Sequence, residues 1–188
     1  LAKLAGARLD VHALELDRPT QDFTVAPAMS AAECTAALAQ GWNAVDEGAD
    51  LLVVGEMGIA NPTSAAAIAL ALFGGEPGDW VGRGTGVSDA GLALKAEVIG
   101  QGLARNPQAK KDGLAALAAF GGREVAAMAG AIARARMLRV PVILDGFICC
   151  AAAACLEIAQ PGTLDHAVAG HEGAEAAHRR LLGLLGKP

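Results

Sequence analysis

Three apolar runs of strand length divide the chain, and each is followed by a turn containing glycine and then by a helix-like segment. The runs are Leu51–Val54, Val140–Leu144 and Leu164–Ala169. Short continuous apolar runs are typical of strands buried on both faces, as in parallel sheets. An earlier stretch, Arg8–Leu16, alternates apolar and polar residues and predicts a fourth strand. The four units predict an α/β fold of three layers, αβα, around a mostly parallel, doubly wound (Rossmann-like) sheet in one domain over residues 1–188.

Helix signals fill the intervals between the predicted strands. Ser30 and Glu33 have the spacing of a capping box, so a helix is expected from Ala31 to Glu47. Asn61 before Pro62 predicts an N-cap and a first helical residue. Several alanines and Gly130 within 123–138 predict a closely packed helix. Further helices are expected at 62–73, 90–104, 114–120, 123–138, 146–159 and 174–182, with the end of a helix at 1–7 and a long loop at 17–29.

The composition of the chain argues against nucleic acid and membrane as binding partners. The net charge is −5, aromatic residues make up 3% of the chain and tyrosine is absent. These values argue against a nucleic-acid surface, which needs basic patches and stacking rings. The longest apolar stretch, Val140–Leu156, contains Asp145 and falls short of the roughly 20 residues that a spanning helix requires. No signal peptide is visible, so we expect a cytoplasmic protein that binds neither nucleic acid nor membrane.

Neither the cysteines nor the histidines have the spacing of a metal site. Cys34, Cys149, Cys150 and Cys155 form no CxxC pair, and we predict buried, reduced thiols. The histidines form no HxxxH or HExxH pattern. We expect His166 to be a core residue and His171, in the turn after the third run, to be the histidine nearest a ligand.

The turn after the first run, within Leu51–Ser64, is the strongest candidate site. Gly55, Glu56 and Gly58 lead from the strand into a helix N-terminus, where free N–H groups at the carboxyl edge of a sheet bind anions. Glu56 does not attract a phosphate, so we expect its carboxylate to face a hydroxyl or a developing positive charge. The alternative is an exposed turn residue without a ligand.

A second glycine-rich turn lies within Trp80–Gly91. Its GxGxG pattern matches neither the dinucleotide fingerprint nor the Walker A pattern. Arg83 lies in the turn, and Lys95 on the next helix leans back toward it, so both side chains and the loop amides suit a phosphate or a carboxylate. The alternatives are a flexible loop and a Lys95 paired with an acid on its own helix. The glycines are Gly82, Gly84 and Gly86.

Five motifs occur in one order along nearly the whole chain. They are GEMGIANPTSAAAI, VGRGTGVSDAGLALK, FGGREVAAMAGAI, VPVILDGF and AGHEGAEAAH. In this combination the sequence resembles the nicotinate-nucleotide:dimethylbenzimidazole phosphoribosyltransferase (CobT-type) family. That family transfers phosphoribose from nicotinate mononucleotide to 5,6-dimethylbenzimidazole, which gives α-ribazole 5′-phosphate and nicotinate in cobalamin lower-ligand assembly.

The resemblance implies a set of roles. Glu56 and Lys95 match catalytic positions, and the family's general-base glutamate belongs to a motif beyond Pro188. It implies no cofactor, no metal, a homodimer, and nicotinate mononucleotide and a benzimidazole-type base as small-molecule substrates. The matched substrate-binding positions are Gly55, Gly58, Asn61, Gly82, Arg83, Gly84, Thr85, Gly86, Asp145, Gly146 and His171.

Other interpretations stay open at this point. We expect the natural chain to extend past both ends, and the 188 residues alone to be inactive. A family-derived domain that binds a nucleotide without catalysis, or a relative that uses another base, fits the same motifs. An unrelated dinucleotide enzyme fits less well, because GxGxG lacks the acidic residue that contacts the ribose.

Overall fold

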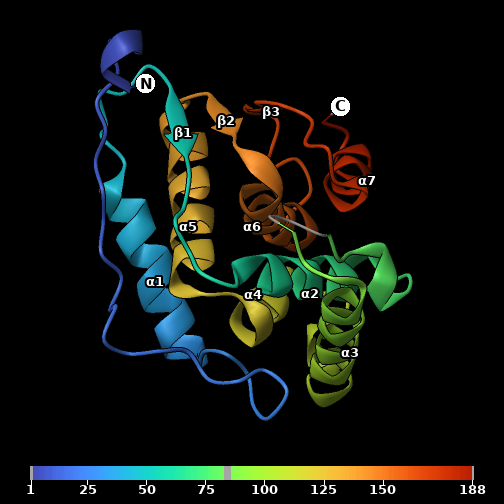
Figure 1. The fold of residues 1–188 in the computed structure, drawn as a ribbon. Helices are drawn as coiled ribbons and strands as arrows, with labels where there is room; N and C mark the ends of the chain where they lie inside the picture. Colours follow the sequence, from blue (N-terminus) through green and yellow to red (C-terminus); the bar gives the residue numbers. More distant parts are fainter. Residues whose placement is uncertain (1, 83–85, 188) are drawn as a thin grey trace.

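The computed structural model describes residues 2–82 and 86–187. Three strands, β1 (Leu52–Val54), β2 (Val142–Leu144) and β3 (Ala167–Ala169), form a parallel sheet in the order β1-β2-β3 (Figure 1). In the register, Val53 lies opposite Ile143. The α/β class and the parallel sheet are confirmed, and each strand is the carboxyl-terminal part of its predicted run.

The helices follow the predicted intervals closely. The capping box is formed as expected, with Ser30 as N-cap and Glu33 closing it. The first helix ends at Ala44, three residues earlier than predicted, because Val45 adopts an extended conformation. The helices are α1 (Ala31–Ala44), α2 (Asn61–Phe73), α3 (Asp89–Arg105), α4 (Gly113–Phe120), α5 (Arg123–Leu138), α6 (Gly146–Ala159) and α7 (Ala176–Leu184), with 3₁₀ turns η1 (Ala2–Ala5), η2 (Pro77–Asp79) and η3 (Pro107–Ala109).

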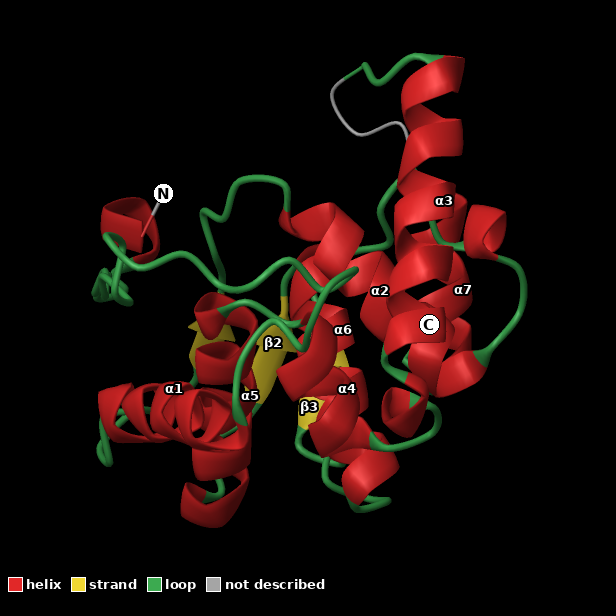
Figure 2. Ribbon diagram, turned by 90° about the horizontal axis from the view of Figure 1, so that it is seen from below, coloured by secondary structure: helices red, strands yellow, loops and turns green. Residues whose placement is uncertain are grey.

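The described helices gather on one face of the sheet. Helix α5 packs against β1, α6 packs against β2, and α5 and α6 contact each other. In Figure 2, α1 and α5 lie together at one end of the molecule, and α3 and α7 lie at the other. On the opposite face, Val53 and Val168 are 57% and 60% exposed. The described residues therefore cover this sheet on one face, although its apolar strands predicted cover on both.

Glycines bring two helix pairs into backbone contact. A Cβ on Gly130 of α5 would overlap the carbonyl oxygen of Leu38 on α1, and a Cβ on Gly41 would overlap the backbone of Ala127. Gly113 of α4 meets the carbonyl oxygen of Cys155 on α6 in the same way. The close packing predicted for the small residues of 123–138 is thus confirmed between α1 and α5.

The predicted strand at Arg8–Leu16 is wrong. The segment runs extended along the molecule, and its ends are tethered by side chains: Arg8 pairs with Asp46 at 2.7 Å and Glu15 with Arg123 at 3.2 Å. A strand needs a ladder partner, and no described strand lies beside it, so the chain has three strands in its described part where four were predicted. The alternating apolar side chains are largely exposed: Leu9 (73%), Val11 (87%) and Leu16 (82%).

The interior is built from small side chains, as the composition requires. Helix α6 is buried from Cys149 to Leu156, and all four cysteines are buried and free, as predicted. His166 lies one residue before β3, half-buried, with Nε2 3.1 Å from the carbonyl oxygen of Ile132. Across residues 2–82 and 86–187, no helix combines the length and apolarity needed to cross a membrane.

Candidate active site at the carboxyl edge of the sheet

The turn after β1 holds the carboxylate of Glu56 in a fixed place. Its Oε2 accepts hydrogen bonds from the backbone N–H of Gly58 and from Nδ2 of Asn61, each at 2.5 Å. Glu56 is half-buried, whereas Met57 and Ile59 beside it are fully exposed. Hydrogen bonds to an ionised carboxylate are stronger than those between neutral groups. Glu56 is therefore not a freely exposed turn residue, and its second oxygen carries no described protein donor.

Asn61 does not cap its helix as predicted. The N-cap of α2 is Ala60, in the left-handed conformation with φ 66°, and Asn61 is the first helical residue with only 5% exposure. The prediction failed because the helix begins at Asn61 itself, with Ala60 as the N-cap, and the Nδ2 of Asn61 donates to Glu56 instead. An alanine in the left-handed region costs about 1–2 kcal/mol. This turn therefore contains local backbone strain.

A second carboxylate, which the sequence analysis missed, adjoins the first. Oε1 of Glu124, in the first turn of α5, lies 3.4 Å from Nδ2 of Asn61. The amide nitrogen thus faces Glu56 and Glu124 together. The two acids are far apart in sequence, so no local pattern links them. The available signal was the position of Glu124 after Gly121-Gly122, at the start of a predicted helix.

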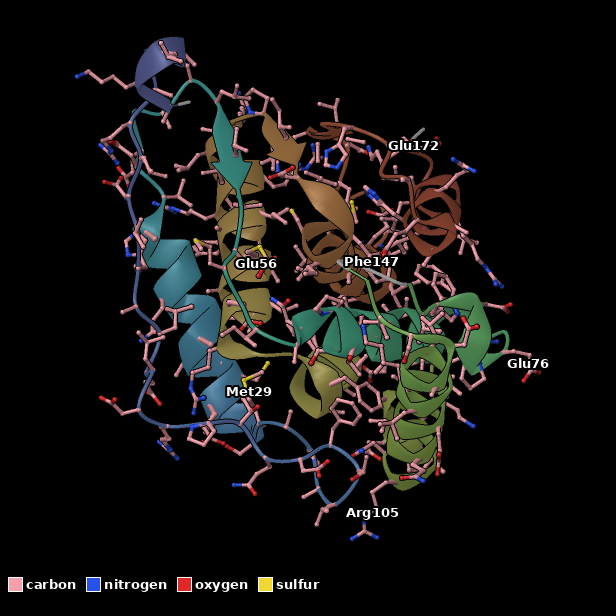
Figure 3. The ribbon with its side chains drawn as sticks, viewed as in Figure 1. Met29, Glu56, Glu76, Arg105, Phe147 and Glu172 are labelled. Carbon is pink, nitrogen blue, oxygen red and sulfur yellow. The ribbon has the colours of Figure 1, made fainter. Side chains whose placement is uncertain are left out.

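The turns after β2 and β3 meet at the same edge. Oδ1 of Asp145, which precedes Gly146 and α6, lies 3.4 Å from Nδ1 of His171, and both side chains are about half exposed. The ring of His171 contacts the ring of His178 at 5.5 Å, edge to face. Figure 3 shows Glu56 and Phe147 near the middle of the molecule, where β1 and β2 end. The structure thus brings Asp145 and His171, two of the predicted site residues, within contact distance.

His178 on α7 holds the turn that follows β3 through a hydrogen bond. Its Nδ1 accepts the backbone N–H of Gly173 at 3.0 Å, which assigns the proton to Nε2, and Nε2 lies 3.6 Å from Sγ of Cys150. Burial lowers the pKa of His178, with a smaller contribution from His171. The neutral ring fits this position, because a protonated Nδ1 could not accept from Gly173.

The thiol of Cys149 lies buried in the first turns of α6. Burial is the main cause that raises its pKa to about 12, and the nearby Cys150, Asp145 and Glu56 raise it further. The thiol therefore stays protonated near neutral pH, as suits a cysteine in the core.

The glycine-rich turn approaches the third turn at one residue. A Cβ on Gly82 would overlap the carboxylate of Glu175, just before α7, so a larger residue there would displace that side chain. Gly86 is exposed, with φ 114°. Arg83, Gly84 and Thr85 lie outside the described residues. Lys95, in the second turn of α3, makes no hydrogen bond or ion pair with a described residue, so its predicted reach to the loop stays a prediction.

The candidate site is an open edge of the sheet. Two hollows in the described surface lie elsewhere: one of about 220 Å³ is lined by Glu33 and Arg123, and one of about 510 Å³ by Met29 and Ala119. At the edge itself, a fixed carboxylate, an Asp–His pair and several glycine turns face solvent. Such an edge suits a polar ligand that combines hydroxyls, an anionic group and a centre of positive charge.

The fold defines an α/β protein whose candidate site lies at the carboxyl ends of parallel strands. Nucleotide-binding α/β proteins bind their ligands at this edge of the sheet. Comparison with known proteins gives the family. A phosphoribosyltransferase family model (DBI_PRT) matches residues 1–188, and the chain belongs to this family.

Named relatives support the assignment. The nicotinate-nucleotide–dimethylbenzimidazole phosphoribosyltransferase of Ruegeria sp. (strain TM1040) is 66% identical over 187 residues, which cover 100% of this chain and 55% of that protein. The enzyme of the same name from Jannaschia sp. (strain CCS1) is 64% identical and is covered to 56%. The crystal structure of CobT from Thermus thermophilus superposes with a TM-score of 0.83 at 40% identity, covering 90% of this chain and 52% of that one. The chain thus spans about half the length of the relatives it matches.

Proposed function

We propose that the protein carrying this chain transfers the phosphoribosyl group of nicotinate mononucleotide to 5,6-dimethylbenzimidazole. The products are α-ribazole 5′-phosphate and nicotinate. Family membership and the names of the relatives support this reaction. The observation that carries it here is the Glu56 carboxylate, held by Gly58 and Asn61 at the edge where the three glycine turns follow the three strands.

The chemistry of the donor explains why a fixed carboxylate is useful. Nicotinate in its nucleotide is a pyridinium, and it leaves as a neutral ring that keeps its carboxylate. As the glycosidic bond breaks, positive charge builds on the ribose, as in glycosyl transfer generally. A carboxylate already aimed at that position stabilises the charge without having to reorient during the reaction. Glu56 has this role in our proposal, through the oxygen that no described donor occupies.

The remaining predicted residues divide between phosphate and ribose. Backbone amides of the turn from Gly82 to Gly86, together with Arg83 and Lys95, bind the phosphate and hold the ribose in line for attack. Asp145, paired with His171, faces ribose hydroxyls or the base. The incoming benzimidazole must lose its N–H proton, and the family resemblance assigns this general-base role to a glutamate beyond Pro188.

A product assay on the full-length protein tests the proposal. Nicotinate mononucleotide is supplied with dimethylbenzimidazole, benzimidazole, adenine or phenol, and products are identified by mass spectrometry. We expect α-ribazole 5′-phosphate with dimethylbenzimidazole and at least a tenfold loss of kcat/KM in Glu56→Gln and in Lys95→Ala. Glu47→Gln, a change of an exposed acid paired with Arg134, is the matched control. Absence of product with every base would overturn the reaction, and two active-site variants within threefold of wild type would overturn the assigned roles.

Assembly and location belong to the same proposal. We propose that the protein is a homodimer in the cytoplasm, by resemblance to the family. Reduced, buried cysteines are usual in that compartment. Light scattering of the full-length protein gives its mass in solution, and fractionation of the source cells gives its location. A monomeric mass or a membrane-bound protein would contradict these two points.

A further inference from the structure

The amide of Asn61 joins two carboxylates that come from different parts of the chain. Asn61 is 5% exposed, and its Nδ2 faces Oε2 of Glu56 on its own turn and Oε1 of Glu124 on α5. An amide nitrogen has two hydrogens to donate, and a carboxylate only accepts. Two flanking carboxylates therefore require the nitrogen, and not the oxygen, of the Asn61 side chain to point toward them.

Two glycines provide the space for this arrangement. A Cβ on Gly58 would overlap the amide of Asn61 and would lie 3.2 Å from Oε1 of Glu124. A Cβ on Gly122, at the N-cap of α5, would overlap the carboxylate of Glu124. The carboxylate of Glu124 thus lies between two backbones that approach it because neither carries a side chain. Its position is set by packing as well as by its hydrogen bond.

We infer that Glu124 is a positioning residue for the transfer reaction, an inference that rests on the proposed function. By accepting from Asn61, Glu124 holds the amide so that its other hydrogen fixes Glu56. Without Glu124, the buried amide is free to turn its oxygen toward Glu56, where an acceptor would face an acceptor. Glu56 would then keep only the donor from Gly58.

The alternative role for Glu124 is helix stabilisation alone. An acid in the first turn of a helix interacts favourably with the positive end of the helix dipole. That role needs the charge of Glu124 and does not involve Asn61 or Glu56. The two roles therefore give opposite results in a glutamine variant, which removes the charge and keeps an acceptor oxygen.

The test measures kcat and KM for nicotinate mononucleotide in the full-length protein. We expect Glu124→Ala and Asn61→Ala to lower kcat by about tenfold or more, and the double variant to be no worse than Asn61→Ala. Glu124→Gln should recover kcat to within threefold of wild type. In a Glu56→Gln background, adding Glu124→Ala should change kcat by less than twofold, because the residue that Glu124 positions is already disabled. Glu47→Gln is the surface control.

Three results would overturn the inference: a Glu124→Ala variant as active as wild type, a Glu124→Gln variant as impaired as Glu124→Ala, or effects of Glu56→Gln and Glu124→Ala that multiply. Thermal unfolding of each variant verifies the fold, and Glu124→Ser, which suits the first turn of a helix, takes the place of the alanine variant if that one does not fold. A wild-type protein without transferase activity would refute the proposed function instead, so the two failures are distinguishable.

Discussion

The backbone contact between α1 and α5 can be tested with one methyl group. In Gly130→Ala, the new Cβ would overlap the carbonyl oxygen of Leu38 and approach the Cα of the same residue at 3.1 Å. Both partners are main-chain atoms of a helix, so neither can turn aside as a flexible side chain would. The two helices must move apart for the methyl group to fit.

Two opposing effects determine how much Gly130→Ala changes the free energy of unfolding. Replacing a mid-helix glycine by alanine normally stabilises a helix by about 0.8–1 kcal/mol. Overpacking a well-packed core costs about 1–3 kcal/mol, and a clash between backbones belongs at the upper end of that range. The difference predicts that Gly130→Ala lowers the free energy of unfolding by about 2 kcal/mol. For a domain of this size, that corresponds to a fall in Tm of about 4–8 °C.

Gly100 is a matched control on another helix. It also lies within a helix, α3, but its Cβ would meet only Cγ of Pro77, at an ordinary distance of 3.5 Å. Gly100→Ala should therefore raise the free energy of unfolding by about 0.5–1 kcal/mol, the helix-propensity term alone. Urea titration followed by circular dichroism measures both variants. If Gly130→Ala were as stable as Gly100→Ala, the close contact of α1 and α5 would be refuted.

Three further predictions concern the edge of the sheet. Ala60→Gly replaces an alanine in the left-handed conformation, φ 66°, and should raise the free energy of unfolding, measured by urea titration, by about 0.5–1 kcal/mol. A lower free energy of unfolding would contradict backbone strain at Ala60. Burial lowers the pKa of His178, so below about pH 6.5 the unfolded chain takes up the proton first, and stability should fall as the pH drops toward the lower pKa of the folded protein. His178→Asn, which keeps an acceptor at the δ position, should flatten this dependence between about pH 7.5 and 5.5, and an unchanged slope would refute the assignment. Gly82→Ala should raise KM for nicotinate mononucleotide by about tenfold, because a Cβ there displaces the carboxylate of Glu175 and disturbs the turn. Gly78→Ala is the control, since its Cβ would meet nothing within 4 Å, and it should leave KM unchanged. Equal effects of the two variants on KM would refute a role for the close contact at Gly82.

Local signals in the sequence were enough for most of the fold. The helix Arg123–Leu138 has the bounds that its pattern predicted, and Ser30 caps α1 as its spacing to Glu33 indicated. These features depend on neighbours a few residues away. Arg8–Leu16 shows the opposite case, because a strand depends on a partner that the segment itself does not specify.

The residues of the candidate site also differ in whether local sequence predicts them. Glu56, Asp145 and His171 follow directly after strands, so their shared edge could be predicted from the order of elements. Glu124 could not be found in this way, because its contact with Asn61 spans 63 positions of sequence and arises only when α5 packs beside β1. The failure at Asn61 is a different case, because the helix begins one residue earlier than its capping pattern indicated and the side chain donates to Glu56 in its own turn.

The sheet face that carries Val53 and Val168 has a practical consequence. Proteins in water seldom leave neighbouring aliphatic side chains uncovered on a sheet, and bare strands invite association. A 188-residue polypeptide made by itself should therefore form aggregates as its concentration rises, and a fusion or co-expression that shields this surface should keep it dispersed.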